Sequence, residues 1–179
     1  MAASELQASA LAHYQAGRFA EAATAFEQAA AAFRAEGNAT MAAEMLNNLG
    51  VAHRAQKNYT AALPPIETAL TEFRALNDRT RAAQALGNLG AVLLETGDLK
   101  RAGTVLNEAL TLLDPETETD KAIRSEILRV LGEVRLKQGR YVDGIMNYEA
   151  GLRDVENRTP RQNWLLKLLQ KPLKMLGRK

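Results

Sequence analysis

The sequence predicts an all-α fold, a right-handed α-α superhelix built from four helical hairpins and one C-terminal helix. Of its 179 residues, 32 are Ala and 26 are Leu, both strong helix formers. Only 5% are aromatic, whereas a sheet protein would need more β-branched and aromatic residues. A segment of about 40 residues also recurs four times, and such a period is typical of stacked repeats.

The repeat appears when three tripeptides are aligned at offsets of 40 and 42 residues: Asn48-Leu49-Gly50, Asn88-Leu89-Gly90 and Val130-Leu131-Gly132. A short turn begins seven residues after each Gly, and Gly17-Arg18-Phe19 fits the same frame one repeat earlier. Large and small side chains alternate around each turn at helical spacing. Two antiparallel helices approach closely only where one offers Gly or Ala and the other inserts a large side chain. Each repeat is therefore predicted to be a helical hairpin.

Four stacked hairpins bury a continuous core that one hairpin alone could not form. Helices are expected in pairs over residues 4–16 and 19–35, 40–56 and 59–76, 80–96 and 98–113, and 119–138 and 141–156. Asn58 and Asp98 are suited to cap the helices that follow them, and Asp114-Pro115 to end the third hairpin. Pro64-Pro65 lies inside an expected helix, which it should either bend in its first turns or delay to Leu63; we expect the bend.

The recurring positions resemble the tetratricopeptide repeat family over residues 3–156, and most of all the extended-helix repeats of kinesin light chains and bacterial regulatory proteins. We expect repeats over 3–38, 43–77, 83–116 and 125–157, followed by a basic amphipathic helix over 158–179. The resemblance implies a non-enzymatic scaffold or adaptor that binds a protein or peptide partner, and we expect it in the cytoplasm. The first repeat departs from the pattern at Ser9-Ala10. Gly144 and Gly151 in the fourth repeat predict looser packing there.

The first helix of each hairpin is expected to line a concave groove. Asn48 and Asn88 precede the Leu-Gly pairs, and their amides can both donate to and accept from a peptide backbone. The resemblance implies that an Asn at this position contacts bound peptide. Neighbouring polar residues should share or border the inner face and select the ligand sequence: Asn47, Arg54, Gln84, Glu95, Arg129 and Glu133. The alternative, that these are ordinary solvated positions, stays open.

No catalytic or cofactor motif is visible. His13 and His53 occupy the same repeat position 40 residues apart, too far to share a metal ion or a proton, and are expected to pack between helices. The chain has no Cys and no glycine-rich phosphate loop. The acid-rich stretch 114–120 lacks calcium-loop spacing and is expected to be a solvated loop. We therefore expect no enzyme activity, no cofactor and no metal.

Charge is concentrated at one end of the sequence. Seven basic residues and no acidic ones lie between 157 and 179, whereas residues 1–156 hold 16 basic and 21 acidic residues. The pI near 9.0 is thus a property of one short segment, so a nucleic-acid partner for the whole chain is not indicated. Pro160 is suited to the first position of a helix. Apolar residues fill all of this helix's surface except a narrow polar sector, and Pro172 should kink or end the helix.

Three interpretations of this helix remain open: a cap on the last hairpin, a helix lying on an anionic membrane surface, or a helix that docks into a partner protein or nucleic acid. In the second, the chain would be a peripheral membrane adaptor, and the contact residues would be Trp164, Lys167, Leu168, Lys171 and Lys174. A homodimer through this helix is also open. These roles can coexist, because a cap needs only a narrow apolar stripe. Neither a signal peptide nor an apolar run long enough to span a membrane is visible.

Overall fold

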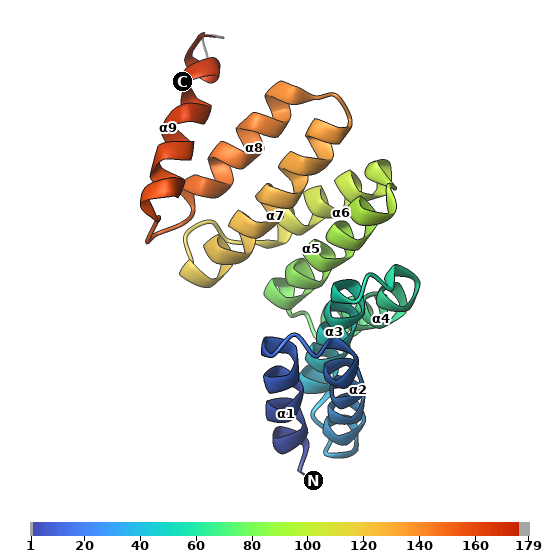
Figure 1. Cartoon of the computed structure of the whole chain (residues 1–179). Coiled ribbons are helices and arrows are strands. Elements are labelled where there is room, and N and C mark those ends of the chain that lie inside the picture. The colour runs from blue at the N-terminus through green and yellow to red at the C-terminus, as the bar shows by residue number, and fades with distance from the viewer. Residues whose placement is uncertain (1, 176–179) are drawn as a thin grey trace.

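The computed structural model describes residues 2–175, with side chains through Gln170, and this part is helical without strands. The helices are α1 (Ala3–Gln15), α2 (Phe19–Ala35), α3 (Ala39–Ala55), α4 (Tyr59–Ala75), α5 (Arg79–Thr96), α6 (Leu99–Leu112), α7 (Glu118–Lys137), α8 (Tyr141–Arg153) and α9 (Pro160–Met175). Consecutive helices pair as hairpins, and the second helix of each hairpin packs on the first helix of the next (Figure 1). The predicted hairpin stack is confirmed.

The close approach within hairpins occurs at the predicted small residues. A Cβ atom added to Gly50 would lie 2.3 Å from Cγ1 of Ile66, and one added to Gly90 would lie 2.5 Å from Leu106. Both large side chains are fully buried, so each fills the space that the missing Cβ leaves. The alternation of large and small residues in the sequence therefore corresponds to real contacts between paired helices.

Helix starts follow the predicted capping chemistry. The side chains of Asn58 and Asp98 accept hydrogen bonds from main-chain N–H groups of Ala61 and Arg101, at 3.3 and 3.1 Å. The cap at Asn58 fixes the start of α4 at Tyr59, so the alternative of a start delayed to Leu63 is wrong. The helix continues through both prolines to Ala75.

The helix expected over 141–156 ends earlier, at Arg153. The Arg158 guanidinium folds back and donates to the main-chain oxygens of Leu152, Arg153 and Val155 at 2.8–3.1 Å. These bonds satisfy the carbonyl groups that a helix end leaves without partners. An arginine beyond the helix thus caps the end of α8.

Adjacent hairpins are joined by polar links as well as by the core. Gln56 Nε2 donates to the main-chain oxygen of Phe19 at 3.0 Å, and Gln138 Nε2 donates to that of Leu99 at 2.9 Å. These two links occupy equivalent repeat positions. The second helices are also joined by ion pairs, one of which connects Arg34 to Glu72 at 2.5 Å.

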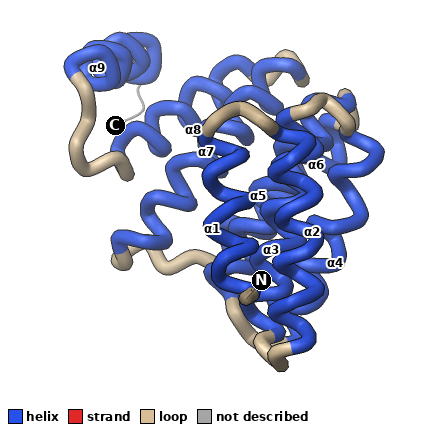
Figure 2. The backbone as a smooth tube through the Cα atoms, turned by 60° about the horizontal axis from the view of Figure 1, so that its bottom comes forward, coloured by secondary structure: helices blue, strands red, loops and turns tan. Residues whose placement is uncertain are grey.

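Helix α8 is less well buried than the earlier second helices, but the looser packing predicted from its glycines is wrong. A Cβ atom added to Gly144 would lie 2.7 Å from Leu136, and one added to Gly151 would lie 2.9 Å from the main-chain oxygen of Ser125, so both glycines allow α8 to pack closely on α7. Tyr141 at the start of α8 is 67% exposed, whereas the equivalent Phe19, Tyr59 and Leu99 are half-buried. Of the residues of α8, only Gly144, Glu149 and Gly151 are buried. Helix α9 contacts α8 and lies at the edge of the molecule, outside the bundle formed by the other helices (Figure 2).

Candidate functional site

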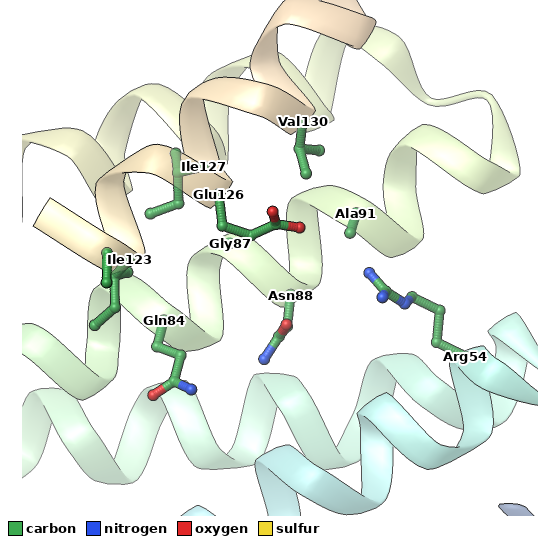
Figure 3. Close-up of a pocket in the computed structure, with 10 residues that line it drawn as sticks. Arg54, Gln84, Gly87, Asn88, Ala91, Ile123, Glu126, Ile127 and Val130 are labelled. Carbon is green, nitrogen blue, oxygen red and sulfur yellow. The ribbon is translucent and has the colours of Figure 1, made fainter. Parts of the chain in front are cut away.

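A pocket of about 320 Å³ opens between the first helices of the second, third and fourth hairpins, α3, α5 and α7 (Figure 3). Its lining is mostly small or apolar, with three polar side chains from α3 and α5 and one from α7: Arg54, Gln84, Gly87, Asn88, Ala91, Ala122, Ile123, Glu126, Ile127 and Val130. The first helices of the last three hairpins therefore line this pocket, whereas α1 contributes no residue to it.

The depth of the pocket comes from small residues in the third hairpin. Gly87 and Ala91 occupy the repeat positions that Asn47 and Val51 hold one hairpin earlier. A Cβ atom added to Gly87 would lie 3.1 Å from Cγ1 of Ile127, so the glycine also lets α7 approach α5. Aligning the repeats by side-chain size would have revealed these two positions, which an interpretation based on polar residues alone misses.

Charged groups reach the pocket from two sides. Arg54 extends from α3, and Glu126 extends from α7 into the same space (Figure 3). Glu126 is already bound by Arg129, with N–O distances of 2.6 and 2.9 Å. Within the described part of the chain, Arg54 has no carboxylate partner. The pocket therefore holds one arginine whose charge is free to bind a ligand.

The asparagines differ from the predicted pair of peptide contacts. Asn88 Nδ2 donates to Oδ1 of Asn47 at 3.0 Å, and this bond joins α5 to α3. Asn47, expected to border the inner face, is only 3% exposed, because it packs between these helices as the acceptor of that bond. Asn48 is half-buried, and its amide has no hydrogen-bond partner among residues 2–170. Asn48, which lies outside the pocket lining, thus keeps its whole amide for a ligand, whereas Asn88 keeps its oxygen.

The other predicted groove residues divide into two sets. Gln84 is exposed and lines the pocket. Glu95, Arg129 and Glu133 lie outside the pocket lining: Arg129 binds Glu126, and Glu133 faces Lys137 at 3.7 Å. Glu95 interacts with Tyr59, whose pKa is raised by partial burial first and by its hydrogen bond to Glu95 second.

The two histidines are half-buried on separate hairpins, as predicted. The Nδ1 atoms of His13 and His53 are both buried, and neither has a hydrogen-bond partner in the described structure. Among residues 2–170, moreover, no three acidic or histidine side chains come together as a metal-ligand set.

Helix α9 has one side against the body and one side exposed. Leu165, Leu166 and Leu169 are half-buried, whereas Trp164 is 63% and Leu168 43% exposed. Lys167 is exposed beside them. The side chains of Lys171 and Lys174, also predicted as contacts, lie outside the described residues. One side of α9 therefore packs on α8, and its other side is left exposed.

Comparison with known proteins agrees with this architecture. A family model described as Tetratricopeptide repeat matches residues 1–75, 41–114 and 81–157, which together cover all four hairpins. No curated protein matches the chain. Repeats of this kind generally mediate protein–protein interactions, and the fold is generally a non-enzymatic scaffold. Its repeat pattern, its hairpin stack and this match together establish that the chain belongs to the tetratricopeptide repeat family.

Proposed function

We propose that this protein is an adaptor that binds a peptide segment or helix of a partner protein in the groove between α3, α5 and α7. The observation that carries the proposal is that Arg54, at a pocket with an apolar wall, has no carboxylate partner among residues 2–170. An unpaired cation at the rim of an apolar pocket is an arrangement that ligands of opposite charge complete.

Different residues of the pocket would bind different parts of the ligand. The wall formed by Ala91, Ile123 and Ile127 would take an apolar side chain of the ligand, and its burial would provide most of the affinity. Arg54 would bind an acidic residue next to that side chain. Asn48 and Asn88 would bond to the ligand backbone. The ligand we expect is therefore an acidic segment with one large apolar side chain.

Peptide selection followed by titration tests the proposal. Peptides from a displayed random library are selected on the folded protein, and the enriched peptide is synthesised with a fluorescent label. Its Kd is measured by anisotropy against the wild type and against Ala122→Phe, which fills the pocket from an exposed position. Ala31→Phe is the matched control, because Ala31 is also exposed but lies on α2.

We expect Ala122→Phe to weaken binding at least tenfold and Ala31→Phe to leave it unchanged. Arg54→Gln should weaken binding by roughly ten- to a hundredfold, the range for loss of a charge-assisted hydrogen bond. A peptide that binds both Phe variants as tightly as the wild type would place the binding surface elsewhere and refute the groove.

A further inference from the structure

The exposed side of α9 presents apolar and cationic side chains together. Trp164 and Leu168 are one helical turn apart, so they project from the same side of the helix. Arg161 and Lys167 each lie three residues from Trp164, one before it and one after, and both are exposed. The outward stripe therefore has an apolar centre with a cation on either side.

The two cations have no carboxylate partner in the part of the chain whose side chains are described. Among residues 2–170, neither Arg161 nor Lys167 forms an ion pair, whereas Arg158 is occupied with the end of α8. No acidic residue follows Glu156 in the sequence, and five further basic residues do so besides these two. The charges of Arg161 and Lys167 are therefore left for an external anion.

Like charges argue against a second copy of the chain as that partner. A symmetric dimer through α9 would bring each stripe against its own counterpart, with its cations facing cations. An anionic bilayer instead offers negative charge over a wide surface, together with an interfacial layer in which Trp is favoured. A helix with cations on either side of its exposed apolar residues is suited to lie on such a surface. No helix in the described part is long and apolar enough to cross a membrane.

We propose that α9 binds the surface of anionic membranes, with Trp164 and Leu168 inserted between headgroups and with Arg161 and Lys167 at phosphate level. Residues 1–156 carry five more acidic than basic residues, so an anionic surface repels them. The contact is thus confined to the C-terminal end. It is separate from the groove and does not depend on the groove having a ligand.

The chain has one Trp, so its fluorescence reports on α9 alone. The purified full chain is mixed with vesicles of phosphatidylcholine and phosphatidylglycerol, or of phosphatidylcholine only. We expect the Trp164 emission to shift to shorter wavelength and the protein to co-sediment with the anionic vesicles alone. Added salt should weaken both effects, because charge brings the helix to the surface.

Two exposed lysines provide matched variants. Lys167→Glu should reduce partitioning into anionic vesicles by roughly tenfold or more, since each charge near the surface contributes. Lys100→Glu makes the same charge change on α6 and should leave partitioning within about twofold, because α6 does not contact the bilayer. Leu168→Ser, which leaves the charge unchanged, should weaken binding as well. Circular dichroism confirms that each variant is folded.

Three outcomes would overturn the proposal. One is equal loss of binding in both lysine variants, which would show a non-specific charge effect. Another is the absence of any emission shift with anionic vesicles. The third is a shift that depends on protein concentration without vesicles, accompanied by a larger sedimentation coefficient, which would show that α9 joins two copies instead.

Discussion

Removing the amide of Asn88 should destabilise the fold, whereas removing that of Asn48 should not, although both occupy the same repeat position. The Nδ2 group of Asn88 bonds to Oδ1 of Asn47 at 3.0 Å, and Asn47 is 3% exposed. Asn88→Ala leaves that oxygen buried without a donor, which costs about 1–3 kcal/mol. Asn48→Ala breaks no hydrogen bond within the described structure, so its cost should stay within about 0.5 kcal/mol.

Urea unfolding followed by circular dichroism measures both changes. The double variant Asn47→Ala/Asn88→Ala removes the donor and the acceptor together, so it should cost less than the sum of the two single variants. The bond would have no energetic role if Asn88→Ala were as stable as Asn48→Ala, or if the double variant were additive. The result also matters for binding assays, because only Asn48→Ala tests ligand contact without altering the contact between α3 and α5.

Three further predictions concern packing, capping and titration. Gly50→Ala should lower the free energy of unfolding in urea by about 1–3 kcal/mol, and by more than Gly90→Ala. The methyl group added at Gly50 meets a main-chain oxygen at 2.8 Å, whereas the three atoms nearest to the one added at Gly90 all belong to the Leu106 side chain. Asn58→Ala should cost about 1 kcal/mol, seen as a lower Tm, because α4 loses its N-cap. A hydrogen bond to Glu118 raises the pKa of Glu156, so protonation of Glu156 favours the folded state and stability from this group grows as pH falls through that pKa. Glu118→Gln should bring the pKa of Glu156 back towards its ordinary value in a carboxyl NMR titration.

The hairpin stack could be predicted from the sequence because its determinants recur at fixed spacing. Gly50 and Gly90 each face one large side chain, and the same pairing in successive repeats makes the pattern visible without a structure. Asn58 and Asp98 act locally, within three residues of the N–H groups that they cap. Periodic and local interactions are the ones that a single sequence exposes.

Contacts that do not recur from repeat to repeat could not be predicted. Asn47 and Asn88 are 41 residues apart and sit at different repeat positions, so alignment of the repeats does not pair them. Arg158 caps the early end of α8 by binding carbonyl groups three to six residues before it; this contact is local, but it does not recur in the repeat pattern from which the end of the helix was predicted. For the same reason, the helical periodicity of the sequence predicted which polar residues lie near the groove, but it did not show which of them are already hydrogen-bonded or ion-paired within the protein.

The position of the pocket follows from side-chain size in a single repeat. The pocket is lined by α3, α5 and α7, and it forms beside α5, where Gly87 and Ala91 replace the larger Asn47 and Val51 of the preceding hairpin. Gly87 also sets how closely α7 can approach, since its missing Cβ leaves 3.1 Å to Ile127. One glycine therefore controls both the stacking of two hairpins and the depth of the pocket between them. A substitution at Gly87 that altered which ligand binds would therefore also alter the contact between the two hairpins. Substitutions at the exposed Gln84 or Ala122 could alter ligand preference without disturbing that contact.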